Sequence, residues 1–172
     1  MRTYKIVGLL LILGIVSCNQ KQNDTSKGKE INLIKEMDSN RGEGVITKVS
    51  TQDFENTYNT LVEIITNNPN LKIVAQLDHQ ANAASVGLKI NPTRVIMFGN
   101  PKLGTPLMQN AQIVGLDLPQ KILIWQDEQG VVNVSYNDPE FLKNRHGISD
   151  NEEILTTIAK ALDNISKGTI GK

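Results

Sequence analysis

The hydrophobic period changes in a fixed order along the chain, and this order restricts the folds that it can adopt. Residues 45–49 form a short β-branched run that predicts a strand. Apolar residues then recur at helical spacing from Phe54 to Ile65, and Asn67-Asn68-Pro69 predicts the end of that helix. Residues 71–79 alternate between apolar and polar positions, with His79 in phase with the apolar set, and predict a half-buried strand.

The second half of the pattern predicts three more strands and a closing helix. The strands are expected at Arg94–Phe98, Lys121–Trp125 and Val131–Tyr136. A short helical insert is predicted between the third and fourth strands, over Leu103–Gln112, and the last helix runs through Ile154 and Ile165. The order strand-helix-four strands-helix predicts an α+β fold, with an antiparallel-type sheet and its helices on one face.

Three helix starts carry capping signals. Ser50 with Asp53, and Asp150 with Glu153, have the spacing of a capping box, although the first has Asp where Glu is usual. Asp138 followed by Pro139 predicts the start of a short helix, because proline fits the first helical position.

Two strands are apolar on both faces, so the second face of the sheet needs cover. Residues 95–98 and 122–125 place apolar side chains on either side, yet two helices can cover only one face. A homodimer packed sheet to sheet would supply the cover. The segment 80–92 of the same chain is the alternative.

The first 17 residues have the form of a signal peptide. Arg2 and Lys5 precede an unbroken apolar run over residues 6–16, which is too short for an ordinary transmembrane helix. Ile15-Val16-Ser17-Cys18 follows and resembles a bacterial lipobox. The resemblance implies cleavage before Cys18, diacylglycerol on its sulfur and acylation of its amino group, for example by palmitate.

The expected product is a lipoprotein of the bacterial cell envelope, with its domain outside the cytoplasm. Residues 18–43 comprise the lipidated Cys18 and a polar tether, and residues 44–172 form one domain. The acyl chains make the membrane a partner of the protein through the anchor. Because Cys18 is the only cysteine, no disulfide or Cys-x-x-Cys pair can form within the chain.

The charge balance argues against nucleic-acid binding. The precursor has 18 basic and 18 acidic residues. Cleavage removes Arg2 and Lys5 but no acid, so the mature chain is slightly acidic and lacks the positive field that phosphate binding needs.

A run of specific residues from about His79 to Gly147 carries a family resemblance. It includes Asp78-His79, Val86-Gly87-Leu88, Phe98-Gly99-Asn100-Pro101-Lys102-Leu103-Gly104-Thr105-Pro106-Leu107-Met108, Gly115-Leu116-Asp117-Leu118-Pro119, Tyr136-Asn137-Asp138-Pro139 and Arg145-His146-Gly147. This stretch resembles the domain-of-unknown-function 302 family. The resemblance implies a fold like that of the TATA-binding protein and a dimer as a plausible state, but no reaction.

The segment 99–108 is the first candidate site. Its Gly-x-x-x-x-Gly spacing is that of a phosphate-binding loop, but Thr105 stands where that loop needs lysine. In a weaker version, Asn100, Lys102 and the amides of Gly104 and Thr105 hold a small anion. The structural alternative is a rigid turn.

His79 is the second candidate. At the rim of an apolar layer it could bind a backbone carbonyl, act as a general base or ligate a metal. Met108 could complete a soft-metal site with it. His146, by contrast, ends a predicted helix, where a cationic side chain complements the helix dipole, so a structural role is expected.

These residues favour a binding module over an enzyme. The leading hypothesis places a small ligand or ion near His79 and the 99–108 loop, with Asn100, Lys102, Thr105 and Met108 as candidate contacts. The alternatives are a structural or dimerisation module without a ligand, and an enzyme that uses His79 as acid or base. Which cofactor the domain uses, if it uses one, is unknown from the sequence.

Overall fold

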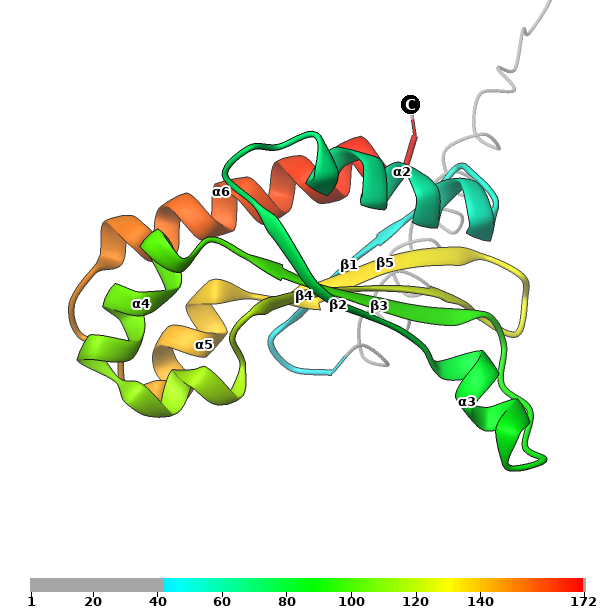
Figure 1. Cartoon of the computed structure of the whole chain (residues 1–172), viewed down its shortest axis with the longest axis horizontal. Coiled ribbons are helices and arrows are strands. Elements are labelled where there is room, and N and C mark those ends of the chain that lie inside the picture. The colour runs from blue at the N-terminus through cyan, green and yellow to red at the C-terminus, as the bar shows by residue number, and fades with distance from the viewer. Residues whose placement is uncertain (1–41, 172) are drawn as a thin grey trace, which may run out of the picture. The chain divides into compact units, whose positions relative to one another are not determined.

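A five-stranded antiparallel sheet forms the centre of the domain (Figure 1). The structure is a computed structural model and describes residues 42–171. Within them the strands lie in the order β1-β5-β4-β3-β2. Their bounds are β1 Val45–Val49, β2 Lys72–Asp78, β3 Thr93–Gly99, β4 Gln120–Gln126 and β5 Val132–Asn137. The predicted signal peptide, Cys18 and nearly all of the tether lie outside the described residues.

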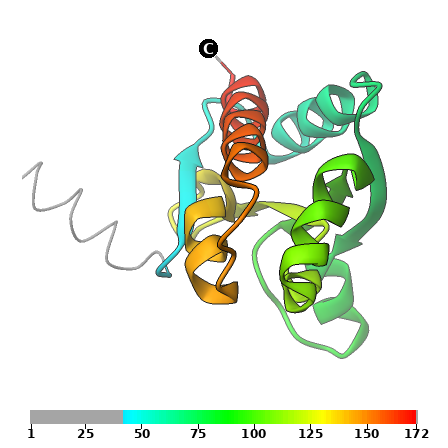
Figure 2. The ribbon, with the colours of Figure 1, turned by 90° about the vertical axis from the view of Figure 1, so that its left-hand side faces the viewer.

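Two long helices, α2 and α6, lie on the same side of the sheet (Figures 1 and 2). The helices of the described part are α2 Phe54–Thr66, α3 His79–Ser85, α4 Pro101–Asn110, α5 Pro139–His146 and α6 Glu152–Thr169, with a 3-10 helix η1 at Gln112–Leu116. The predicted strand-helix-four strands-helix order is therefore confirmed. Helix α5 is the short helix predicted after Asp138, and α3 is an addition to the predicted order. None of the helices between residues 42 and 171 has the length and apolar character needed to cross a membrane.

The core lies between the sheet and these two helices. Leu61 and Ile65 of α2 and Leu162 of α6 are completely or almost completely buried. The sheet turns three buried residues toward these helices: Ile96, Ile122 and Val134. Ile96 of β3 pairs with Ile122 of β4, and Val134 of β5 pairs with Ile124, which lies on the same face of β4 as Ile122. On the opposite side of β3 and β4, Met97, Leu123 and Trp125 are half-buried and Val95 is buried. Trp125 lies on this second face, where its indole nitrogen donates to Ser135 Oγ at 2.9 Å.

Strand β2 departs from the predicted alternation. Ile73 pairs with Phe98, but the next pair is Ala75 with Met97, so a bulge at Val74 moves Ala75 and Leu77 to the opposite face. The strand also ends one residue early. Asp78 accepts from the amide of Ala81 and caps α3, so the predicted strand residue His79 is the first residue of a helix.

Only one of the three predicted caps is confirmed. Asp138 accepts from Glu140 N at 3.0 Å and starts α5 as predicted. Helix α2 is capped by Asp53 rather than Ser50, because Ser50 is buried and bonds to Thr57 Oγ1 instead. At α6 the capping position belongs to Asn151, which has a left-handed backbone and no side-chain bond to the helix, so the prediction for Asp150 was wrong.

The segment 80–92 does not supply the expected cover for the second face. Most of its residues are exposed, and Val86 and Leu88 are 70% and 65% exposed. In Figure 1 it projects from the far end of β2 and β3, away from α2 and α6. The dimer alternative stays a prediction.

Candidate functional site

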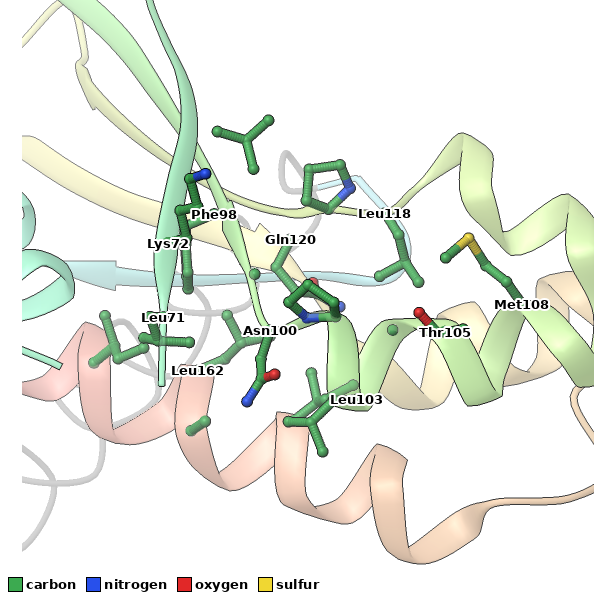
Figure 3. Close-up of a pocket in the computed structure, with 18 residues that line it drawn as sticks. Leu71, Lys72, Phe98, Asn100, Leu103, Thr105, Met108, Leu118, Gln120 and Leu162 are labelled. Carbon is green, nitrogen blue, oxygen red and sulfur yellow. The ribbon is translucent and has the colours of Figure 1, made fainter. Parts of the chain in front are cut away.

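An apolar pocket lies where the starting end of β2 and the last residues of β3 meet α4 and α6 (Figure 3). Its volume is about 420 Å³, and sites for small molecules have about 300–1,000 Å³. Helix α6 contributes one wall, made of Ile158, Ala161, Leu162 and Ile165. The other walls include Leu71, Phe98, Leu103, Met108 and Leu118. We call this the α4–α6 pocket.

Asn100 determines how α4 enters this pocket. Its side-chain oxygen accepts from Lys102 N at 3.0 Å, and its backbone carbonyl accepts from the amides of Leu103 and Gly104. Pro101 takes the first helical position, where a missing N–H costs nothing. The predicted loop is therefore mostly helix. Because the Gly104 amide is used inside this helix, it cannot help to hold an anion as the sequence suggested.

Gln120 is the unusual residue of the pocket. It is nine-tenths buried, it lines the cavity, and no hydrogen bond to its side chain is found within residues 42–171. Yet every fully enclosed side-chain nitrogen or oxygen in this part of the chain has a hydrogen-bond partner. The Gln120 amide therefore reaches the open space of the pocket, where one donor and one acceptor group stand among apolar walls.

Charge in the pocket comes from a single lining residue. Lys72 is the only charged side chain among the residues that line it, and no acid joins it. The ion pairs of residues 42–171 do not include Lys72. The pocket therefore suits a neutral or anionic molecule better than a cationic one.

Three of the predicted site residues meet here and two do not. Asn100, Thr105 and Met108 line the pocket, whereas Lys102 is exposed and does not. His79 lies beyond the other end of β2. The seven residues of that strand separate it from the pocket by about 20 Å, given a rise of about 3.3 Å per residue. The predicted joint site of His79 and the 99–108 segment does not form.

The same separation removes the predicted soft-metal pair. His79 and Met108 lie at opposite ends of the strands, so they cannot ligate one ion. In the described part of the chain, no group of three or more His, Cys, Asp and Glu side chains is arranged to hold a metal.

Arg94 lies near His79, at the centre of a polar cluster. Its guanidinium bonds to Asp78 and Glu55, both at 2.8 Å, and lies over the rings of Phe54 and Tyr58. The Ala81 amide and then Arg94 hold the pKa of Asp78 below its ordinary value, and these carboxylates raise the pKa of Arg94. Burial raises the pKa of the Tyr58 hydroxyl. The cluster joins α2 to the sheet and contains no unpaired reactive group.

His146 has the structural place predicted for it, with a partner that the sequence did not reveal. At the end of α5, its Nε2 lies 2.5 Å from Asp117 Oδ2, and its side chain is 3% exposed. Arg145 reaches the same carboxylate at 3.3 Å. Asp117 lies 29 residues away in the chain, so only the fold brings the pair together.

The sequence analysis missed Gln120 as a pocket residue. Its signal was a break in periodicity: Gln120 shares the inward phase of Ile122 and Ile124, where an apolar residue is expected. The α6 wall could not be recognised, because Ile158 and Leu162 fit an ordinary core stripe equally well.

Fold and site together define a small α+β domain with an apolar pocket beside an antiparallel sheet. The chain belongs to the DUF302 family, a domain of unknown function, whose model matches residues 46–165. Its structure resembles the crystal structure of an uncharacterized conserved DUF302 protein from Bacillus stearothermophilus, with a TM-score of 0.66 and 19% identity. The match covers 74% of this chain and 99% of that one.

Relatives also occur inside longer proteins. Over 84 residues the chain is 40% identical to the fluoride-specific ion channel FluC 1 of Brucella suis biovar 1 (strain 1330) and to FluC 2 of Brucella melitensis biotype 1. The match covers 49% of this chain, but 33% of the first protein and 31% of the second. The chain thus matches about a third of the length of these relatives.

Proposed function

We propose that the domain binds a small, mostly apolar molecule in the α4–α6 pocket, and that the lipid on Cys18 holds it at the membrane outside the cytoplasm. The single observation that carries the binding proposal is the Gln120 amide, nine-tenths buried and without a partner in the pocket wall. Because its polar atoms are not fully enclosed and find no partner among residues 42–171, they remain available to hydrogen-bond a molecule in the pocket.

The lining defines the chemical class of the ligand. Its walls are apolar, and each methylene group that they take from water contributes about 0.8 kcal/mol. Gln120 can donate to a carbonyl or carboxylate and accept from a hydroxyl. With Lys72 as the one charged lining residue, the ligand is a neutral or acidic amphiphile, such as a medium-chain alcohol or fatty acid. This replaces the ion as the favoured ligand.

The membrane location has support of a different kind. Cys18 lies outside the described residues, so its support is the lipobox that precedes it. Related sequences also occur in proteins named as ion channels, which is consistent with a domain that functions at a membrane. A membrane-bound domain would meet amphiphiles at high local concentration.

The enzyme hypothesis loses its main support. That hypothesis used His79 as the acid or base, but His79 lies at the opposite end of β2 from the pocket. In this geometry the histidine cannot act on a molecule in the α4–α6 pocket.

Binding is tested on the isolated domain, residues 42–172. The Bacillus stearothermophilus protein consists almost entirely of the matched region, so the domain can fold without a preceding segment. The probe is 8-anilinonaphthalene-1-sulfonate, an apolar anionic fluorophore, displaced by dodecanol or dodecanoic acid. We expect saturable fluorescence that either competitor abolishes.

A matched pair of variants locates the binding. Ala161→Trp fills the pocket from α6, whereas Lys160→Trp places the same ring on the exposed side of that helix. Dodecanol affinity should fall at least tenfold in the first variant and stay unchanged in the second. Equal binding by both variants would place the ligand elsewhere and overturn the proposal.

A further inference from the structure

Helix α3 and the residues after it form an arm, residues 79–92, whose apolar side chains lie in solvent. None of the α3 residues is buried, and Val86, Leu88 and Ile90 are 70%, 65% and 45% exposed. Lys89 lies between two of them and is the only charged residue of the arm. Clustered exposed aliphatic side chains of this kind mark a surface that contacts a protein or a membrane.

The 3-10 helix η1 carries a second exposed apolar pair. Ile113 is 60% exposed and Leu116 is 72% exposed. Residues three apart in a 3-10 helix project on the same side, so these two side chains form one apolar tip. The arm follows the end of β2 and η1 precedes the start of β4, so the two tips lie at opposite ends of the strands.

Both tips lie on the side of the sheet that faces away from the two long helices. Figures 1 and 2 show α2 and α6 above the sheet, and α3, η1 and α5 below it. We call this the lower side. None of the exposed large hydrophobic residues between 42 and 171 belongs to α2 or α6. The strands instead place exposed Val45, Val49 and Leu77 on the lower side.

The middle of the lower side is closed by the sheet's own side chains. Val95, Asn133 and Ser135 are buried there. A partner that fills a groove would therefore find no groove between the tips. A broad surface such as a lipid bilayer can touch both tips at once.

The charges of the lower side fit an anionic surface. Strands β2 and β4 place Lys72 and Lys121 on it, and the arm adds Lys89. Asp78 is the one acidic residue in the five strands, and it faces the other way and bonds to Arg94. Basic side chains next to exposed aliphatic ones are typical of surfaces that bind anionic lipid headgroups.

We propose that the lower side is the surface by which the domain lies on the membrane, with the arm and η1 entering the headgroup layer of an anionic bilayer. The chain enters the described domain on this same side (Figures 1 and 2), so a tether from Cys18 does not have to pass around the domain. The inference rests on the membrane location proposed above, but not on a ligand in the pocket.

The test holds the chain on vesicles without its lipid. Residues 19–172 contain no cysteine, so single introduced cysteines can carry the environment-sensitive fluorophore nitrobenzoxadiazole. An N-terminal polyhistidine tag binds the chain to phosphatidylethanolamine–phosphatidylglycerol vesicles that contain a nickel-chelating lipid. The outcome is therefore independent of whether Cys18 is lipidated in cells.

The position of the label decides the expected response. On Leu88→Cys or Leu116→Cys the emission should shift to the blue and rise about twofold, because the label leaves water for the headgroup layer. On Lys160→Cys it should stay unchanged, since Lys160 is exposed on α6, above the sheet. Equal responses at the three positions would overturn the proposal.

A second substitution tests whether the two tips meet the bilayer together. Leu88→Glu should reduce the response of the label at position 116 by about half, whereas Lys160→Glu should not change it. Leu88 and Leu116 lie outside the hydrophobic core, so circular dichroism should be unaffected. A response at position 116 that Leu88→Glu leaves intact would overturn the proposal. So would a label on Leu88→Cys that is already blue-shifted without vesicles, because a second copy would then cover the arm.

Discussion

The imidazole of His146 and the carboxylate of Asp117 meet at 2.5 Å and join the end of α5 to the residue that follows η1. Both side chains are largely enclosed, at 3% and 13% exposure. Removing one member of such a pair leaves the other without its partner in a place that water reaches poorly. The contact therefore holds the segment that leads from η1 through Leu118 to the pocket.

We expect Asp117→Ala to lower the free energy of unfolding by about 2 kcal/mol, because it leaves the buried His146 ring without its hydrogen-bond partner. Arg145→Ala is the control, since this arginine contacts the same carboxylate but is 52% exposed, and it should cost less than about 1 kcal/mol. Urea unfolding measures both. A larger loss in the arginine variant would contradict this ranking.

Gly44 predicts a second effect on stability. Its φ is 74°, and a Cβ at this position would overlap the ring of Phe141. Gly44→Ala should therefore destabilise the domain by about 2–4 kcal/mol, through backbone strain and the clash together. Gly147 has a φ of 62° with open space around it, so Gly147→Ala should cost only about 1 kcal/mol. Similar losses in thermal unfolding would show that the Phe141 contact is unimportant.

Asp78 predicts a pH effect. Its pKa is lowered from 3.8 in the folded domain, so its ion pair with Arg94 stabilises the fold above that pH and is lost as acid protonates the carboxylate. Asp78→Asn keeps an acceptor for the α3 cap but removes the charge. At pH 7 we expect a loss below about 1 kcal/mol, since the pair is solvent-accessible. The gap between wild type and variant should close below about pH 4; a gap that widens in acid would refute this assignment.

The anchor is tested through Cys18. In cells labelled with an alkyne fatty acid, the wild-type chain should carry the label and sediment with membranes. Cys18→Ser should lose the label, because the sulfur and the amino terminus of this residue are the expected attachment points. Label that persists in the variant would contradict lipidation at Cys18.

The order of strands and long helices could be predicted from the sequence, because each has a clear period of its own. Residues 45–49, for example, form the predicted strand without change. Helix α3 could not be predicted, since it buries nothing and leaves no periodic signal. The bulge at Val74 was also hidden, because an alternating pattern cannot show that one residue is left out of the pairing.

The candidate site was half predictable. Asn100, Thr105 and Met108 belong to one distinctive segment and do line the pocket. His79 was predicted to join them because its phase in the expected strand put it at the rim of an apolar layer. Because β2 and β3 are antiparallel, the end of β2 lies beside the start of β3. His79 therefore lies near Arg94, at the opposite edge of the sheet from Asn100.

Gln120 predicts a trade between stability and binding. Gln120→Leu replaces a nine-tenths buried side chain, whose amide has no partner among residues 42–171, with an apolar one of similar size, which should stabilise the empty domain by about 0.5–1 kcal/mol. The same variant should bind dodecanol about fivefold more weakly, the equivalent of one lost hydrogen bond of about 1 kcal/mol. A variant that is less stable and binds equally well would mean that the amide has a structural role.

The most direct test of the pocket is a contact between a ligand and Gln120, measured by NMR on the labelled domain with dodecanol. We predict nuclear Overhauser effects from the Gln120 side-chain NH₂ to the protons beside the hydroxyl, and saturable shifts of the Leu71 and Leu162 methyl groups. Shifts confined to Leu123 and Trp125 on the second face of the sheet, or no saturable shift at all, would contradict binding in the α4–α6 pocket.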